Sequence, residues 1–254
     1  MRTVLTAPRS TSSSGTPRFD RLDALRGAAL VWMAVFHFCF DLAHRGLIEA
    51  NFYRDAVWTG QRTVILTLFL CCAGAGQAIA SAQGQSWGRF WRRWAQVAGC
   101  AVLVSAGSYL MFPRSYIYFG VLHGMAVMLI IARLSAPLGR WLWLLGLGAV
   151  LLPQYAAHPV FDQRALHWVG LVTHKPITED YVPVLPWLGV MWWALAATQW
   201  LLARHPHWLA SSHSPGVPQR GLTWLGQWSL TFYMLHQPLL IGALELGWWL
   251  THRA

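Results

Sequence analysis

The chain contains repeated apolar runs close to the roughly 20 residues that a helix needs to cross a lipid bilayer. They lie at residues 22–43, 63–82, 92–112, 116–133, 139–153, 185–203 and 224–250. The fifth run is short and the seventh is long. Because lipid offers no partners for backbone polar groups, such runs are predicted to be α-helical. The expected fold class is an all-α, polytopic transmembrane helix bundle with about seven spans.

The composition supports one membrane domain preceded by a short tail. Charged residues make up 11% of the chain, against about a quarter in an average soluble domain, and hydrophobic residues make up 56%. Residues 1–19 are polar and rich in Ser, Thr and Pro, which predicts a disordered cytoplasmic tail. Residues 20–254 are expected to form a single transmembrane domain in contact with the lipid bilayer.

The basic residues predict how the bundle is oriented. Of the 19 Lys and Arg residues, 12 fall on one side of the predicted spans and 7 on the other. Because basic loops stay on the cytoplasmic side, the N-terminus is expected in the cytoplasm and the C-terminus outside. The net charge of +10 is then explained by topology, and no nucleic-acid partner is expected.

The first run contains LVWMAVFHFCFDL, which carries ionisable residues that are costly in lipid. At 100° per residue, Arg26 and His37 share one helix face, and Asp23 and Asp41 lie about 60° from Arg26. His37 is roughly 16 Å deeper than Arg26, near mid-membrane. This stripe predicts a polar cavity that runs inward from the cytoplasm. The alternative is a structural His–Asp pair that ties helices together.

Two further histidines lie inside apolar runs, His123 in YFGVLHGMAVML and His236 in SLTFYMLHQPLL. Each alone fits a packing role, whereas three histidines at compatible depths favour one shared site. A neutral imidazole, oriented by Asp41, can take a proton from an attacking amine or hydroxyl, which is the chemistry of acyl transfer. Three histidines can also bind a metal or haem, or relay protons in a transporter. The spacing does not choose among these.

Four motifs in order resemble one family of membrane acyltransferases. They are RLDALRGAALVWMAVFHFCFDL, FGVLHGMAVMLI, EDYVPVLPWLGV and LTWLGQWSLTFYMLHQPLLI. Together they resemble the short bacterial branch of the heparan-α-glucosaminide N-acetyltransferase-like family, over about residues 18–245. The resemblance implies a multi-pass enzyme of a bacterial cytoplasmic (inner) membrane. It implies transfer of an acyl group, usually acetyl, from cytoplasmic acyl-CoA to an amino sugar or glycan hydroxyl at the outer side.

The resemblance also implies roles for individual residues. Arginines would meet the CoA phosphates at the inner mouth, histidines and an aspartate would carry the reaction, and polar and aromatic residues would frame the acceptor. The expected groups are His37, Asp41 and His236 for catalysis; Arg26, Arg92 and Arg93 for the cofactor; and His123, Asp180, Trp187 and Tyr233 for the substrate.

The chain departs from the longer, lysosomal members of the family. Their proposed catalytic histidine lies in the first luminal segment, where His44 is the only histidine of this chain. The catalytic role is therefore open between His37, His44 and neither of them. The competing hypothesis is a proton-coupled transporter or flippase with a buried histidine relay. No metal is predicted, the acceptor is not specified, and a homodimer is one candidate assembly.

Overall fold

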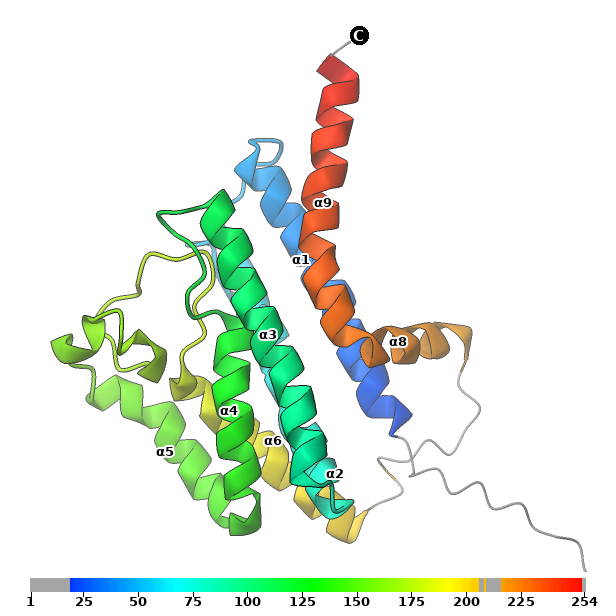
Figure 1. Ribbon diagram of the computed structural model, residues 1–254, viewed down its shortest axis with the longest axis vertical. Coiled ribbons are helices and arrows are strands. Elements are labelled where there is room, and N and C mark those ends of the chain that lie inside the picture. Colours follow the sequence, from blue (N-terminus) through cyan, green and yellow to red (C-terminus); the bar gives the residue numbers. More distant parts are fainter. Residues whose placement is uncertain (1–18, 206–207, 209–215, 253–254) are drawn as a thin grey trace, which may run out of the picture.

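The computed structural model describes residues 19–205, 208 and 216–252, and this part of the chain is a bundle of α-helices (Figure 1). The expected all-α fold is confirmed. Within the described residues, strand pairing is limited to one isolated parallel bridge between Phe119 and Tyr181. The predicted tail, residues 1–19, lies outside the described residues except for Phe19.

Each predicted apolar run overlaps a described helix, although the second helix begins at Ala56 rather than at residue 63. The last run overlaps the end of an additional amphipathic helix as well as the final helix. Short 3₁₀ turns lie in the connections. The helices are α1 (Asp20–His44), α2 (Ala56–Ala82), α3 (Trp87–Met111), α4 (Val121–Ser135), α5 (Trp141–Tyr155), α6 (Val184–Arg204), α8 (Val217–Gln227) and α9 (Ser229–His252). The 3₁₀ turns are η1 (Ala136–Leu138), η2 (Pro159–Asp162) and η3 (His167–Val169).

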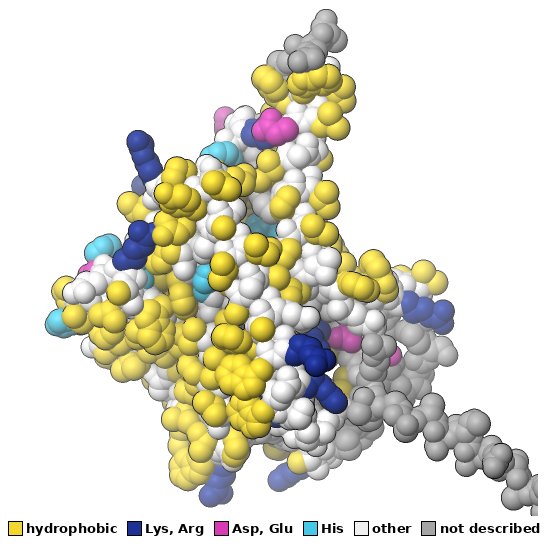
Figure 2. Space-filling model, viewed as in Figure 1, with side chains coloured by type: hydrophobic (Ala, Val, Ile, Leu, Met, Phe, Trp, Pro, Cys, Tyr) yellow, Lys and Arg dark blue, Asp and Glu magenta, His cyan; other side chains and the backbone are white. Residues whose placement is uncertain are grey.

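Four helical segments in the described part of the chain are long and apolar enough to cross a membrane. They are α1, α2, α3 and the continuous segment Val121–Leu138. Hydrophobic side chains cover much of the face shown in Figure 2, and Lys and Arg side chains lie at several of its edges and in one group in the lower middle of the face. This surface suits contact with lipid. The count of seven spans and the cytoplasmic N-terminus stay predictions.

α4 begins at Val121 rather than at residue 116, because the residues before it pair with another loop. The backbone N–H of Glu179 donates to the oxygen of Ser115 at 2.8 Å. The N–H of Val182 donates to the oxygen of Phe119 at 3.2 Å. This pairing keeps the segment before Gly120 extended. His123 therefore lies in the first turn of α4 and not deep within the helix.

The predicted run 224–250 is divided between two helices. α8 ends at Gln227, and the N–H of Trp228 bonds back to the oxygens of Leu225 and Trp224 at 3.1 and 3.3 Å before α9 begins. α8 lies across the direction of α1 and α9 (Figure 1). A short amphipathic helix with exposed tryptophans is typical of the bilayer interface.

Two buried clusters hold the bundle together. The larger lies between α2, α4, α5 and α6, and the smaller packs α1 against α2 and the connection between them. Fully buried side chains of the larger cluster are Leu70, Met128, Leu142, Met191 and Leu195. The smaller cluster consists of Leu30, Met33, Phe36, Phe52 and Ile65, with Phe232 and Tyr233 of α9 against it.

Two glycines allow α1 and α8 to cross in backbone contact. A Cβ added at Gly27 would lie 2.0 Å from the backbone oxygen of Leu222. A Cβ added at Gly226 would lie 1.9 Å from the backbone oxygen of Asp23. Each helix thus presents a glycine to the backbone of the other, which fixes α8 at the start of α1.

Replacement of Gly226 tests this crossing. Gly226→Ala is expected to destabilise the folded protein by about 1–3 kcal/mol, because the new methyl group forces α8 away from α1. Gly221→Ala on the same helix is the matched control, since nothing lies within 4 Å of its added Cβ. It should leave stability unchanged or raise it slightly. Thermal unfolding in detergent measures both, and equal midpoints for the two variants would contradict the close crossing.

Candidate active site

His37 of α1 and His236 of α9 contact each other inside the bundle. Nδ1 of His37 lies 2.7 Å from Nε2 of His236, and the rings stack with centroids 5.0 Å apart. The His236 side chain is buried and that of His37 is half-buried. The structure therefore brings together two histidines that are 199 residues apart in the chain.

The hydrogen bonds around this pair determine where each ring proton lies. Nδ1 of His236 is 2.7 Å from the backbone oxygen of Tyr233, which can only accept, so this nitrogen carries a proton. In the neutral ring, Nε2 of His236 is then an acceptor, and Nδ1 of His37 donates to it. Nε2 of His37 consequently holds a lone pair. An imidazole in this state can act as a base or as a nucleophile.

Asp41 is buried, but its partner is Gln237 and not His37. The side-chain amide of Gln237 donates to both carboxylate oxygens of Asp41, at 2.8 and 3.1 Å. Near the end of α1, Arg45 and Glu245 form an ion pair at 2.5 Å that also joins α1 to α9. Asp41 therefore positions α9 beside α1. The orienting contact expected from Asp41 is made instead by His236.

Arg26 lies near the start of α1, where α8 packs against it. Its Nη1 donates to Oδ1 of Asp23 at 2.9 Å and to the backbone oxygen of Gly226 at 3.5 Å. Arg92 and Arg93 are exposed near the start of α3. Arg26 is thus built into the polar stripe of α1, and a cofactor role for all three arginines stays a prediction.

His123 is engaged at the start of α4 and is not part of the His37–His236 contact. The Ser105 hydroxyl donates to the backbone oxygen of Ile117 at 2.6 Å, so it accepts from Nε2 of His123 at 3.0 Å. Nδ1 of His123 accepts from the N–H of Gly120 at 3.3 Å. Both ring nitrogens are therefore satisfied by α3 and by the start of α4. The contacts of His123 are those of a packing histidine.

Asp180, in the connection between α5 and α6, caps α4. Its Oδ2 accepts from the backbone N–H of Val121 at 2.7 Å. Burial raises the pKa of the Asp180 carboxyl, while this hydrogen bond and the positive charges of Lys175 and Arg62 act in the opposite direction. A carboxylate at a helix N-terminus is also stabilised by the helix dipole. The aspartate of the D-Y-x-P motif therefore orders the start of α4.

Tyr233 of α9 packs beside His236 and is also influenced by the charge of Asp180. Its ring centroid lies 5.7 Å from that of His236, and the charge of Asp180 acts on its hydroxyl group. Tyr233, one of the residues predicted to contact the acceptor, is thus close to the histidine pair. Trp187 instead packs against the larger buried cluster.

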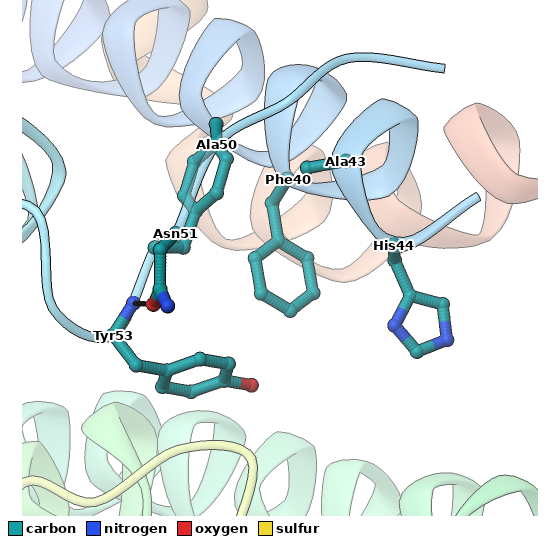
Figure 3. A pocket seen from close by; sticks show the side chains of 7 residues that line it. Phe40, Ala43, His44, Ala50, Asn51 and Tyr53 are labelled. Carbon is teal, nitrogen blue, oxygen red and sulfur yellow. Dashed lines mark hydrogen bonds between the residues drawn. The ribbon is translucent and has the colours of Figure 1, made fainter. Parts of the chain in front are cut away.

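His44, the alternative catalytic residue, lies at the end of α1 on an aromatic pocket of about 240 Å³. The side chains of Phe40, His44 and Tyr53 border the same open space (Figure 3). The ring of His44 stacks with that of Phe40 at 6.3 Å between centroids. His44 is exposed and lies seven residues, or about 10 Å along the helix axis, from His37. The two candidate bases therefore belong to separate places on α1.

Two features of the site were missed by the sequence reasoning. Gln237 follows His236 inside an apolar run, and its polar side chain was a signal that could have been used. The contact of His123 with Ser105 had no such signal. As for metals, no group of three or more His, Cys, Asp or Glu residues suited to hold an ion occurs among the described residues.

A family model matches most of the chain. The model for the catalytic region of heparan-alpha-glucosaminide N-acetyltransferase matches residues 18–238. This range runs from the start of α1 into α9 and includes Arg26, His37 and His236. No curated protein and no solved structure matches the chain.

The pH dependence of stability tests the environment of Asp180. Because its pKa is raised in the folded protein above the ordinary 3.8, the folded chain binds this proton more tightly than the unfolded chain. The contribution of Asp180 to stability therefore falls as the pH rises from about 4 through the raised pKa. Asp180→Asn, which keeps an acceptor for Val121, removes this dependence.

The unfolding midpoint of Asp180→Asn relative to the natural protein should rise between pH 4 and pH 7 in detergent. Asp180→Ala, which lacks the acceptor, should lose about 1 kcal/mol of cap stabilisation. A constant difference between the natural protein and Asp180→Asn over this range would show that the carboxyl group is not perturbed as described.

Proposed function

Because the chain belongs to the heparan-alpha-glucosaminide N-acetyltransferase family, we propose that it transfers an acyl group from acyl-CoA to an amine or hydroxyl of a sugar acceptor. The donor would enter from the cytoplasmic side, and the acceptor from the outer side of a bacterial inner membrane. The family description and the candidate membrane spans support this assignment. The acyl group would usually be acetyl.

The observation that carries the proposal is the His37–His236 contact. His236 donates from Nδ1 to the Tyr233 oxygen, so its Nε2 accepts the proton on Nδ1 of His37. Nε2 of His37 is then the ring nitrogen with a lone pair that no hydrogen bond within the pair uses. His37 is therefore the residue that we assign as base or nucleophile. His236 is the positioning residue that keeps His37 in the reactive tautomer.

In direct transfer, Nε2 of His37 takes the proton from the acceptor amine or hydroxyl as that group attacks the thioester carbonyl carbon. The new C–N or C–O bond forms and the C–S bond breaks. The leaving CoA thiolate then receives the proton from the His37 imidazolium. His37 returns to its neutral state, so protons and electrons balance.

In transfer through an acyl-histidine, Nε2 of His37 attacks the thioester and the C–S bond breaks. The proton on Nδ1 of His37 can then pass to Nε2 of His236 across the 2.7 Å contact. The resulting His236 imidazolium protonates the thiolate, directly or through water. The acceptor amine or hydroxyl then attacks the acyl carbon, the C–N bond to His37 breaks, and the acceptor's proton passes to the released His37 ring, which becomes neutral again. The geometry accommodates both routes.

Nearby groups support an acceptor that carries hydrogen-bond donors. Oε1 of Gln237 is buried and has no hydrogen-bond partner among the described residues. Gln237 follows His236 directly, and Asp41 holds its amide nitrogen. An amine or hydroxyl donating to this oxygen would satisfy it, since an unpaired buried acceptor is costly.

Acetyl-CoA turnover by purified protein, with glucosamine and related amino sugars as acceptors, tests the proposal. His37→Gln is expected to lower kcat by about 100-fold or more, because the base is removed. Arg26→Ala is expected to raise KM for acetyl-CoA. His174→Gln is the matched control, because this histidine side chain is 73% exposed and lies in the connection between α5 and α6. It should retain the natural rate.

If the natural protein is active and His37→Gln keeps its full rate, His37 is not the reactive histidine, and His44→Gln would be the next variant to compare. Solute or proton flux in proteoliposomes without acetyl-CoA consumption would favour the competing transporter hypothesis and refute acyl transfer.

A further inference from the structure

A pocket between α1 and α8 takes no part in the chemistry described above. We call it the α8 pocket; it is lined by Asp20, Arg220, Thr223, Trp224 and Gln227 and has a volume of about 240 Å³. Pockets that enclose a whole drug-sized ligand measure about 300–1,000 Å³. The α8 pocket is therefore suited to one ring system or head group of a larger molecule.

The side chains of the α8 pocket are those that recognise a nucleobase and a phosphate. Trp224 is 62% exposed and offers an aromatic face for base stacking. The carboxylate of Asp20 can accept from an exocyclic amino group, and the side-chain amide of Gln227 can donate to a ring nitrogen. Arg220 supplies positive charge for a phosphate. A purine nucleotide carrying an amino group meets all of these partners at once.

Contacts at the edge of the pocket place it beside Arg26. Gln227 directly follows Gly226, whose backbone oxygen lies 3.5 Å from Nη1 of Arg26. The hydroxyl of Thr223 donates to the backbone oxygen of Asp20 at 3.4 Å, which holds the two walls together. From Arg26 the polar stripe of α1 leads to His37, roughly 16 Å along the helix axis. Asp20 lies six residues before Arg26, about 120° around α1 and roughly 9 Å along its axis, so a ligand that joins the pocket to the histidine pair must be long.

We propose that the α8 pocket binds the adenine nucleotide head of the acyl-CoA donor, an inference that rests on the proposed acyltransferase function. Trp224 stacks on the adenine ring, and Asp20 accepts a hydrogen bond from its amino group. The phosphates lie toward Arg220 and Arg26. The negative charge of Asp20 sets this polarity, because it attracts the amino edge of the base and repels the phosphates.

A phospholipid head group offers part of the same chemistry. Phosphatidylethanolamine carries an ammonium group that suits Asp20 and a phosphate that suits Arg220. It lacks an aromatic ring to stack on Trp224. One arm of the experiment must therefore distinguish binding of a nucleotide from binding of a lipid head group. Another must distinguish a binding role of Trp224 from a general role in membrane anchoring.

The KM values for acetyl-CoA and for S-acetylpantetheine, which lacks the nucleotide, should be compared in phosphatidylcholine nanodiscs. Trp224→Ala is expected to raise KM for acetyl-CoA on the order of tenfold and to leave KM for S-acetylpantetheine unchanged. Trp228→Ala is the matched control, because Trp228 is 56% exposed but does not line the pocket. It should change neither value.

A normal KM for acetyl-CoA in Trp224→Ala, or an equal rise in Trp228→Ala, would overturn the assignment of the pocket. Absence of turnover by the natural protein would instead refute the proposed function.

Calorimetry with adenosine 3′,5′-bisphosphate tests the pocket without turnover, and binding that is lost in Trp224→Ala but kept in Trp228→Ala is expected. Lack of binding by the natural protein would overturn the proposal. Binding abolished by phosphatidylethanolamine in the nanodiscs would assign the pocket to lipid and also overturn it.

Discussion

The polar contacts between α1 and the α8–α9 segment are the constraint on which the rest of the structure depends. In apolar surroundings a polar side chain must find a partner or bear a large desolvation cost. α1 carries three such groups, Arg45 directly follows it, and α8 and α9 supply a partner for each of the four. The pairs are Arg26 with the Gly226 oxygen, His37 with His236, Asp41 with Gln237, and Arg45 with Glu245. Together they favour one register of α9 against α1.

This register gives the histidine pair its chemical character. Two imidazoles in contact have several proton arrangements, but the Tyr233 oxygen permits only a protonated Nδ1 on His236. The direction of both hydrogen bonds follows, and the lone pair is left on Nε2 of His37. The backbone of α9 therefore sets the tautomer of a side chain on α1, which is the physical basis of the proposed acyl transfer.

The lengths of the apolar runs and the periodicity of an α-helix were sufficient to predict the helices and the polar stripe of α1. Helix geometry made it possible to place Arg26, His37 and Asp41 on one side of α1, and apolar run lengths located most helix ends within a few residues. Contacts between distant helices could not be predicted in this way. Gln237 lies 196 residues from Asp41, and no local pattern indicates which of the polar groups on α9 Asp41 will meet. The late start of α4 depends likewise on pairing with a segment far along the chain.

The tautomers of His37 and His236 are the most direct test of the central claim. ¹⁵N NMR of histidine-labelled protein near neutral pH, assigned with single His→Gln variants, distinguishes protonated from unprotonated ring nitrogens. The structure predicts that both rings carry their proton on Nδ1 and that Nε2 of His37 is unprotonated. A proton on Nε2 of His37 in the resting protein would contradict the account, because the proposed base would then have no lone pair to use.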